Sequence, residues 1–350
     1  MYKNFPDFEL LERLTAVPGV PGREEPTAEI IRSSLPSKIS ECSVDRLGNL
    51  VVHIPGKGKR VMLAAHMDEV GLIVQRILPS GFLKIERLGG TSLRAMPGSR
   101  LSLWTSNGRI SAQVVVPPQH LDNNEPLKLT DIFIDVGASS IEETTTMGIS
   151  VGDVLTWDSP LRSFGEFFVS GKALDDRLGC FILIQLAKQI KPQDLKYDLY
   201  LTFTVQEESM LMGGVTAARA IKPDIIIGID GTFAFDTPDL EGNQCDLRLG
   251  NGPALKWMDA IRGKLASFVP NHKLAIKVRE IALKENIPLQ DEVVTGMSTA
   301  VTPLQYTAEG AAALALSVPL RYHHTPIETA DVRDVENIIL LLKAILMNDL

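Results

Sequence analysis

The chain has 350 residues, of which 45% are hydrophobic and 22% charged, and its formal net charge is −8 at pH 7. A chain of this length is too long for one ordinary hydrophobic core, so we expect two domains or one large domain with an insertion. The acidic balance argues against nucleic acid or an anionic membrane as a partner. No uncharged apolar run reaches about 18 residues, and residues 1–7 lack the apolar core of a signal peptide. The three cysteines are too few for a disulfide framework, so we expect a cytoplasmic protein with reduced thiols.

The predicted elements begin with two helices and three strands. Residues 5–15 and 23–34 carry apolar side chains at helical spacing, and a break that contains proline and glycine separates them. Two short strands are predicted at residues 43–46 and 50–54, joined by a turn. A buried strand at residues 60–65 follows. This order of elements is typical of an α/β domain.

The sequence pattern changes between residues 72 and 163. Here short predicted strands, in which apolar and polar residues alternate, are separated by turns that contain glycine and proline. This pattern is typical of a small β-barrel or sandwich. Apolar helices and buried strands then return at residues 178–189, 199–205, 224–229 and 330–350. We therefore predict an α/β fold: an α/β/α catalytic domain with a mixed central sheet, formed by residues 1–71 and 164–350, and an inserted β-barrel-like domain at residues 72–163.

Several predicted strands end in side chains that commonly bind metal ions. These are His66 and Asp68, Glu207 and Glu208, Asp230, and His323 and His324, while Asp175 stands just before a predicted helix. Carboxylates gathered at one sheet edge repel each other and lose hydration, so they need a cation or a shared proton. Histidine nitrogen together with carboxylate oxygen suits zinc or a related divalent ion. A single acidic residue at a strand end is usually a solvated cap, but the recurrence at one edge favours a metal site.

Two pairs of neighbouring residues suggest a division of roles. Glu207 and Glu208 on an extended backbone would point to opposite sides, so that one serves as a base and the other as a ligand. His66 and Asp68 would lie on the same face of a strand, where Asp68 could orient the imidazole. The histidine pair at residues 323–324 is compatible with a polar surface as well as with metal binding.

Five segments of the chain resemble, in order, the signature segments of the M42 metallo-aminopeptidases, a family that includes the glutamyl aminopeptidases and the tetrahedral TET peptidases. They are residues 65–71 (AHMDEVG), 171–180 (GKALDDRLGC), 205–208 (VQEE), 229–230 (ID) and 321–328 (RYHHTPIE). The resemblance covers nearly the whole chain, including the β insertion. It implies two divalent metal ions per chain, either zinc or else cobalt or manganese.

The resemblance also implies a role for each candidate residue. The metal ligands would be His66, Asp175 and Asp230 for one ion, and Asp175, Glu208 and His324 for the other, with Asp175 bridging. Glu207 would be the general base. Asp68 would be a catalytic residue that orients the imidazole of His66 without binding the metal ion itself. His324 is preferred to His323 because the family's histidine stands two residues after the tyrosine.

The implied activity is the hydrolysis of N-terminal residues from short peptides. Two metal ions lower the pKa of a bridging water and polarise the scissile carbonyl, and Glu207 carries a proton to the leaving amine. The resemblance further implies a homo-oligomer, with dimers that assemble into a tetrahedral dodecamer through contacts of the β-rich domain. We expect peptides as substrates, and neither nucleic acid nor membrane as a partner.

The chain departs from the family pattern at two positions of interest. Met212 stands where relatives have an arginine, and Thr299 stands where an aspartate is expected. These changes leave open a metal-dependent deacylase that acts on N-acylated peptides. Glycoside hydrolysis also uses two carboxylates, but they face each other about 5–9.5 Å apart across the bond and have no need of histidines. A non-catalytic binding or assembly protein with the same fold is a further alternative.

Overall fold

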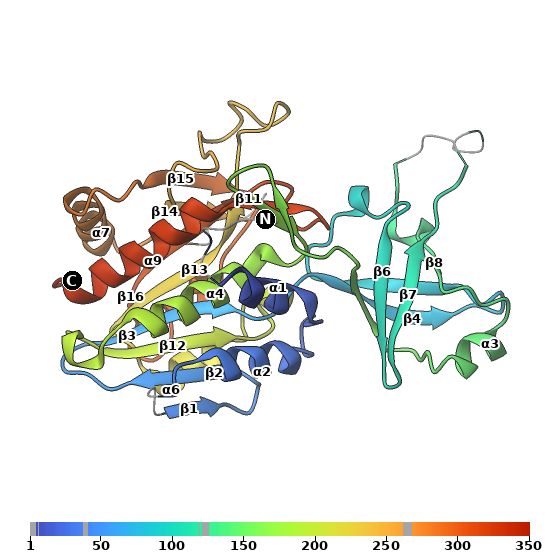
Figure 1. Ribbon diagram of the computed structural model, residues 1–350, viewed down its shortest axis with the longest axis horizontal. Coiled ribbons are helices and arrows are strands. Elements are labelled where there is room, and N and C mark those ends of the chain that lie inside the picture. The colour runs from blue at the N-terminus through green and yellow to red at the C-terminus, as the bar shows by residue number, and fades with distance from the viewer. Residues whose placement is uncertain (1–4, 6, 38–40, 119, 121–125, 262–267) are drawn as a thin grey trace.

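The computed structural model describes residues 5, 7–37, 41–118, 120, 126–261 and 268–350 of the chain. An α/β body, on the left of Figure 1, lies beside a β-barrel on the right. The chain enters the barrel after residue 70 and leaves it after residue 157, so the body is formed from sequence on both sides of the barrel. No helix among these residues is both long and apolar enough to cross a membrane.

The body is built on one mixed sheet of eight strands, in the order β1-β2-β12-β3-β13-β16-β14-β15. The strands are β1 (Glu41–Val44), β2 (Leu50–Ile54), β12 (Asp198–Thr204), β3 (Arg60–His66), β13 (Ile225–Phe233), β16 (Ala312–Leu320), β14 (Ala254–Ala260) and β15 (Gln290–Thr295). The four central strands, β12, β3, β13 and β16, run parallel to one another. Their carboxyl ends therefore meet at one edge of the sheet, which is where open α/β sheets bind ligands.

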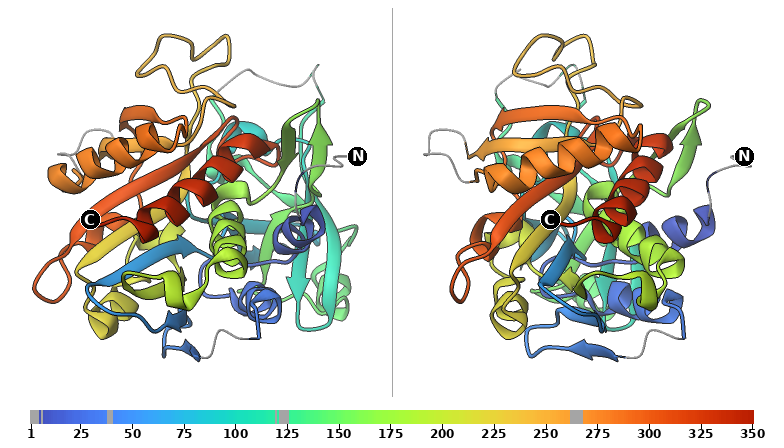
Figure 2. Two further views of the ribbon diagram at one scale, coloured as in Figure 1. Left: turned by 60° about the vertical axis from the view of Figure 1, so that its left-hand side comes forward. Right: turned by 90° about the vertical axis from the view of Figure 1, so that its left-hand side faces the viewer.

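Helices cover both faces of this sheet (Figure 2). One face carries α1 (Phe8–Ala16), α2 (Glu25–Ser34), α4 (Leu174–Gln189), α7 (His272–Lys284) and α9 (Val332–Met347), and the other carries α6 (Val215–Ile221) and α8 (Val301–Leu304). The side chains of β3 alternate between the two resulting cores. Val61 and Leu63 pack in the larger core, whereas Met62 and Ala64 pack in the smaller one with α6 and α8. Burial on both faces explains why β3 is a continuous apolar run in the sequence.

The barrel is closed by six strands in the order β4-β5-β8-β7-β6-β9. They are β4 (Gly71–Ile77), β5 (Leu83–Leu88), β6 (Arg100–Thr105), β7 (Gly108–Val114), β8 (Ile134–Asp135) and β9 (Val154–Trp157), with η1 (Leu93–Ala95), η3 (Leu129–Asp131) and α3 (Ile141–Thr146) between them. Alternate side chains, such as Leu101 and Leu103 of β6, fill a core of the barrel's own. The predicted fold class is confirmed, while the predicted domain limits at residues 72–163 remain a prediction.

A small sheet connects the barrel exit with the C-terminal helix. Its strands are β10 (Arg162–Phe164), β11 (Phe168–Gly171) and β17 (Glu328–Asp331), in that order. Gly171 at the end of β11 pairs with Glu328 at the start of β17. This pairing brings the beginning of α4 next to the segment at residues 321–328. The helix predicted at residues 178–189 lies within α4, in which the backbone of Asp175 and Asp176 is non-helical and the regular helix follows these two residues.

Candidate metal centre

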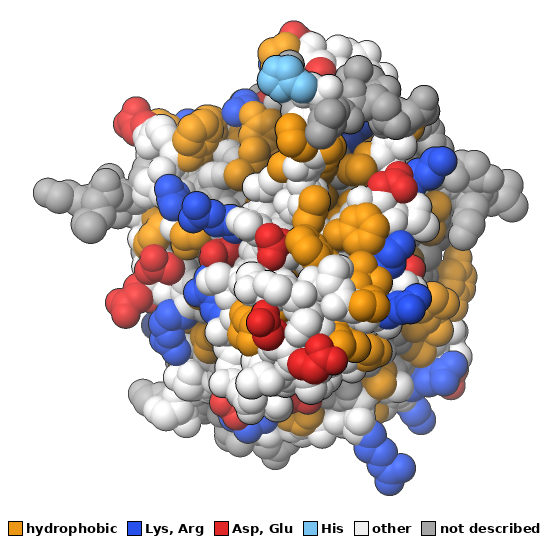
Figure 3. All heavy atoms as spheres, turned by 90° about the vertical axis from the view of Figure 1, so that its right-hand side faces the viewer, with side chains coloured by type: hydrophobic (Ala, Val, Ile, Leu, Met, Phe, Trp, Pro, Cys, Tyr) orange, Lys and Arg blue, Asp and Glu red, His pale blue; other side chains and the backbone are white. Residues whose placement is uncertain are grey.

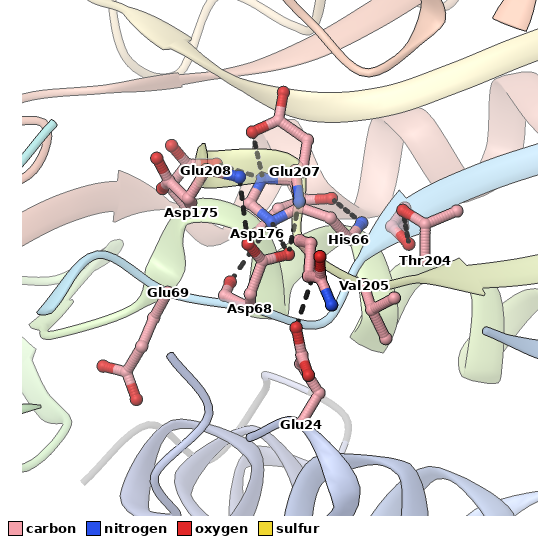
Figure 4. A network of polar contacts seen from close by, with 12 residues as sticks. Glu24, His66, Asp68, Glu69, Asp175, Asp176, Thr204, Val205, Glu207 and Glu208 are labelled. Atoms are coloured by element: carbon pink, nitrogen blue, oxygen red, sulfur yellow. Dashed lines mark hydrogen bonds and ion pairs between the residues drawn. The ribbon is translucent and has the colours of Figure 1, made fainter. Parts of the chain in front are cut away.

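The parallel strands deliver the predicted residues to one edge of the sheet (Figure 4). β3 ends at His66, and Asp230 lies within the neighbouring strand β13. Asp175 lies at the N-terminal end of α4, where its own backbone is non-helical, and α4 packs against both strands. Figure 4 shows His66, Asp175 and Glu207 grouped around one small volume. Residues far apart in the sequence thus meet where the topology predicts a ligand site.

One group of donor atoms is formed by His66, Asp175 and Asp230, and these atoms all lie within 4.8 Å of one another. Nε2 of His66 is 3.2 Å from Oδ1 of Asp175 and 3.7 Å from Oδ1 of Asp230. Oε2 of Glu207 approaches the same nitrogen at 3.9 Å. All four side chains are buried.

A second group of donor atoms lies on the other side of Asp175. Nε2 of His324 is 3.4 Å from Oδ2 of Asp175 and 3.3 Å from Oε1 of Glu208. Nε2 of His323 is 2.8 Å from the same Oδ2 atom. The two oxygens of one buried carboxylate therefore face two separate sets of possible ligands. The structure brings His323 as well as His324 to this point, although the sequence reasoning preferred His324.

The backbone of Glu207 and Glu208 differs from the extended strand that we predicted. β12 ends at Thr204, Gln206 takes a left-handed φ of 54°, and a short helix, α5 (Glu207–Met210), begins. The two glutamates therefore occupy the first turn of a helix, whose N–H groups have no partner within the helix. Asp68 supplies that partner, because its Oδ1 and Oδ2 accept hydrogen bonds from the N–H groups of Glu207 and Glu208. The prediction that alternating strand geometry separates the two side chains is wrong.

Asp68 also departs from its predicted position. β3 ends at His66, so the two residues do not share a strand face. Nδ1 of His66 lies 3.2 Å from the backbone carbonyl oxygen of Asp68, in hydrogen-bonding geometry, and 3.5 Å from its Oδ1. The carbonyl is thus the closer partner of the imidazole. The Asp68 carboxylate instead holds the backbone from which Glu207 and Glu208 project.

Two buried carboxylates that the sequence reasoning did not select support the same centre. Glu328 accepts hydrogen bonds from the N–H groups of Asp175, at 3.2 Å, and His324, at 2.8 Å. Asp176 accepts a hydrogen bond from the N–H group of His66 at 3.1 Å. Both residues lie inside segments that carry the family resemblance, and this resemblance is the one feature of the sequence that pointed to them. Their local sequence gives no other indication, because their partners are more than one hundred residues away or depend on a tight turn.

A further buried pair lies close to the centre. Nζ of Lys256, on β14, is 2.9 Å from Oε1 of Glu292, on β15, and both side chains are completely buried. Thr232 donates a hydrogen bond to the same Glu292 oxygen. Lys256 favours the charged form of Asp230. Neither Lys256 nor Glu292 was predicted, because a charged residue is usually solvated and the sequence does not show that β14 and β15 are adjacent.

The charges of the cluster conflict with one another. Burial, reinforced by the carboxylates of Asp230 and Glu208, raises the pKa of Glu207 well above its usual range. Burial and the nearby Asp175 raise the pKa of Asp230 to about 6. Burial disfavours the charged form of His66, yet the surrounding carboxylates outweigh this effect and raise its pKa. A divalent cation would take the place of the protons that the buried carboxylates otherwise retain.

The donor set fits a divalent metal ion. It consists of imidazole nitrogens and carboxylate oxygens, which are the zinc and cobalt ligands of hydrolases. Oε1 of Glu208 and Nε2 of His323 are buried and lack a hydrogen-bond partner among the described residues. Buried polar atoms of this kind need a partner, and a cation in the centre would supply one for both.

A cavity of about 610 Å³ opens beside the cluster. Its apolar wall includes Leu93 from the barrel and Met210, Phe233, Ile261 and Met297 from the body. A peptide end of a few residues fits a cavity of this size. Neither Met212 nor Thr299 is among the described residues that line it: Met212 is exposed at the surface, and Thr299 is buried. The two departures that motivated a deacylase thus lie outside the cavity wall.

Comparison with known proteins agrees with the fold and the site. Residues 48–341 match the family model of the M42 glutamyl aminopeptidases. The chain is 37% identical to a putative aminopeptidase of Acetivibrio thermocellus, over 96% of this chain and 97% of that protein. It is 34% identical to the lysyl aminopeptidase of Pyrococcus furiosus, over 97% of this chain and 96% of that protein.

The structure is also similar to the TET1 peptidase of Pyrococcus horikoshii, which assembles into a tetrahedron or a large octahedral shell. The TM-score is 0.87 at 30% identity, and the match covers 98% of this chain and 99% of that one. Fold and site together thus define the class of the protein, a peptide hydrolase of the aminopeptidase type. The chain belongs to the M42 peptidase family, as the sequence segments predicted. Membership of this metallopeptidase family implies a divalent metal.

Proposed function

We propose that this chain is a dinuclear metal-dependent aminopeptidase that removes N-terminal residues from short peptides. The observation that carries the proposal is the position of Asp175 between two ligand groups. Its Oδ1 lies 3.2 Å from Nε2 of His66, and its Oδ2 lies 3.4 Å from Nε2 of His324. A carboxylate that faces two donor sets in this way can bridge two cations, as in other two-metal hydrolases.

The proposed ligands follow from these two groups. They are His66, Asp175 and Asp230 for one ion, and Asp175, Glu208 and His324 for the other. Zinc is the ion that this donor set suits best, with cobalt and manganese as alternatives. When bound, the ions supply Lewis acidity, which polarises the scissile carbonyl and lowers the pKa of a water molecule.

Glu207 is the proposed general base. Its carboxylate lies at the edge of the cavity, on the body side and next to His66. It would accept the proton of the attacking water and return it to the nitrogen of the leaving amine, a contribution of about 10²–10⁴ in rate. Asp68 does not enter the cavity in this proposal. It fixes the turn from which Glu207 and Glu208 project.

We also propose a homo-oligomer whose subunits meet through the barrel. The similarity to TET1 peptidases, one described as a dodecamer and one as a tetrahedron or a large octahedral shell, supports an assembly of this kind, for which we propose a tetrahedral dodecamer built from dimers. Figure 3 shows the barrel end of the molecule, where apolar side chains lie between charged ones. Exposed apolar residues of the barrel include Val116 and Val151. A shell with enclosed sites would admit short peptides and exclude folded proteins.

A cytoplasmic location completes the proposal. Cys42, Cys180 and Cys245 are free in the structure. Cys180 is buried in α4, and burial raises the pKa of its thiol, which keeps it protonated and unreactive. Such thiols are typical of a reducing compartment.

The test combines metal analysis with substrate hydrolysis. Elemental analysis of the purified protein should find about two divalent ions per chain. A panel of aminoacyl anilides should be cleaved before chelation, not after it, and again after Zn²⁺ or Co²⁺ is added back. Two bound ions without cleavage of any free amino terminus would contradict the aminopeptidase. Release from N-acetylated peptides in that case would establish the deacylase instead.

A further inference from the structure

On the basis of the dinuclear site proposed above, we propose that His323 is an additional metal ligand. It would join Asp175, Glu208 and His324 in a site with two imidazoles. A second imidazole would make this position select Zn²⁺ or Co²⁺ over Mn²⁺ and Mg²⁺. Aligning the chain with the family pattern assigns a ligand role to His324 alone.

Distance is the first observation that supports a ligand role. Nε2 of His323 is 2.8 Å from Oδ2 of Asp175, closer than the 3.4 Å of His324. The donor atoms of Asp175, His323 and His324 all lie within 4.8 Å of one another. Zinc bonds of about 2.0–2.2 Å place two donors on one ion at most about 4.4 Å apart. Small side-chain adjustments therefore bring all three donors onto a single ion.

Burial without a hydrogen bond is the second observation. The side chain of His323 is only 10% exposed, and its Nε2 atom lacks a hydrogen-bond partner among the described residues. The short approach to Asp175 does not have hydrogen-bonding geometry, so it does not satisfy the nitrogen. A buried polar atom left without a partner is unfavourable. A cation bound by the imidazole together with the carboxylate would supply the partner that Nε2 of His323 lacks.

The packing of the ring fixes where this nitrogen points. The imidazole of His323 stacks on that of His324, with ring centroids 4.2 Å apart and an interplanar angle of 29°. The ring of Phe233, at the end of β13, meets it edge to face at 5.0 Å and 88°. The two contacts hold the ring from different sides. Nε2 is thus directed at Asp175 by packing, which is how a ligand is preorganised.

The backbone explains why two adjacent histidines reach the same point. Tyr322 and His324 both have left-handed φ values, of 57° and 59°. On an extended chain the two side chains would point apart, but this turn stacks the two rings instead. Glu328 holds the turn, because it accepts the N–H groups of both His324 and Asp175. Left-handed non-glycine residues persist where the surroundings enforce them, and they cluster at functional sites.

The donor chemistry then predicts the choice of metal. Without His323, the position offers two carboxylates and one imidazole. With His323 it offers two nitrogens and two oxygens, and imidazole suits zinc and cobalt better than manganese or magnesium, which prefer oxygen. The position formed by His66, Asp175 and Asp230 gains no second imidazole, because His66 is the only histidine in that group of described residues. The two positions should therefore differ in their preference for Zn²⁺ over Mn²⁺.

The test is metal binding by the full-length His323→Phe variant, in which the ring packing on Phe233 and His324 is retained without the nitrogen. Zn²⁺ and Mn²⁺ affinities are measured by competition with a chelator, and the Co²⁺-loaded protein is examined by visible absorption. We expect one of the two bound equivalents to bind Zn²⁺ at least about 100-fold more weakly, since even loss of an outer partner costs 10–100-fold. The preference of that site for Zn²⁺ over Mn²⁺ should fall, and its Co²⁺ spectrum should change.

His53→Phe is the matched control. Nε2 of His53 pairs with Asp198 at 2.7 Å, and its ring stacks on Tyr200 at 4.4 Å, away from the centre. This variant should bind both ions like the wild type. Circular dichroism checks the fold, and His323→Asn serves as a second variant if His323→Phe does not fold.

Unchanged Zn²⁺ affinities and an unchanged Co²⁺ spectrum in the His323 variants would overturn the ligand role. A loss below about tenfold without a spectral change would also overturn it, because His323 would then only position Asp175. These readouts need no catalysis. If the wild type binds two ions but cleaves no peptide, the proposed function fails and the ligand role of His323 stands. If the wild type is active and His323→Phe binds metal normally, only the ligand role fails.

Discussion

The carboxylate of Asp68 holds the backbone of Glu207 in place: its Oδ1 accepts the Glu207 N–H at 3.0 Å, while its Oδ2 accepts the Glu208 N–H at 2.9 Å. One side chain just beyond β3 thereby sets the position of a proposed base and of a proposed ligand. It does so through the main chain, so it does not occupy the side-chain carboxylates of the two glutamates. Asp68 itself is buried and makes its two contacts within one turn of α5.

Replacing Asp68 tests this backbone clamp. In Asp68→Asn the amide nitrogen faces one of the two N–H donors, so one hydrogen bond becomes a donor–donor conflict. We expect kcat on an aminoacyl anilide to fall about 10–100-fold, the usual effect of losing a supporting partner. Asp135→Asn is the control, because Asp135 also accepts a backbone N–H, from Gly137, but in the barrel. Wild-type kcat in Asp68→Asn would show that the turn does not depend on this carboxylate.

Replacing Glu207 separates proton transfer from metal binding. Glu207→Gln keeps the size and burial of the side chain but removes its ability to accept a proton. We expect kcat to fall by about 10²–10⁴, with the metal content of the purified protein unchanged. Glu241→Gln, at a glutamate that pairs with Arg248 on the surface, is the control. A Glu207→Gln enzyme that is metal-loaded and fully active would rule out Glu207 as the base.

A methyl group on Gly90 should disturb His324 from the barrel side. A Cβ atom there would lie 2.6 Å from Nδ1 and 2.9 Å from Cε1 of His324, too close for real contacts. We expect Gly90→Ala to weaken binding of one of the two metal ions, as measured by chelator competition. In Gly137→Ala, at φ +78° and with open space around the new atom, the backbone of the same barrel is strained without contact. If both variants bind metal equally well, the close approach of Gly90 has no effect on the centre.

Asp334 should make stability depend on pH. Its carboxylate accepts hydrogen bonds from Gly250 and Gly252, both at 2.7 Å, but burial outweighs these bonds and raises its pKa from 3.8 to about 7. A raised acid pKa means that the folded state binds the proton more tightly. The resulting stability is complete below pH 3.8 and is lost as the pH rises to about 7.

The measurement is urea unfolding of the wild type and of Asp334→Asn between pH 5 and pH 8. The variant lacks the titration, so the midpoint difference, wild type minus variant, should decrease as the pH rises. The difference should then be constant above the folded-state pKa. A midpoint difference that stays constant between pH 5 and pH 8 would show that the hydrogen bonds from Gly250 and Gly252 outweigh burial, because a lowered pKa would put the titration below this range.

The sequence predicted the strand ends well and the turns beyond them poorly. β3 and β12 are apolar runs whose limits follow from composition, so the polar residues at and beyond their carboxyl ends could be found, whereas β13 continues past Asp230 to Phe233 and does not end where we predicted. The helical turn at Glu207 could not be found, because it depends on a left-handed residue, Gln206, and on hydrogen bonds to Asp68, 139 positions away in the sequence. Local pattern carries no information about such a partner.

The same limit applies to the histidine pair and to the buried ion pair. The spacing after Tyr322 selects His324, whereas the stacking that directs His323 at Asp175 arises from two left-handed residues and from Phe233. Lys256 and Glu292 lie on neighbouring strands, although they are 36 positions apart in the sequence. Charged residues are rarely buried unless they are paired, and the pairing is visible only once β14 and β15 are adjacent.

The contact between residue 90 and His324 makes the proposed metal centre depend on how the barrel packs against the body. The Gly90 carbonyl oxygen lies 3.2 Å from Nδ1 of His324, and the Ser92 N–H donates to the His324 carbonyl at 3.2 Å. Both partners come from the barrel, whereas Asp175 and Glu208 come from the body. His324 is thus held by contacts from both units, so the proposed metal centre is complete only where the barrel packs against the body. The short segment at residues 89–92 therefore links the position of the barrel to a single imidazole, that of a proposed metal ligand.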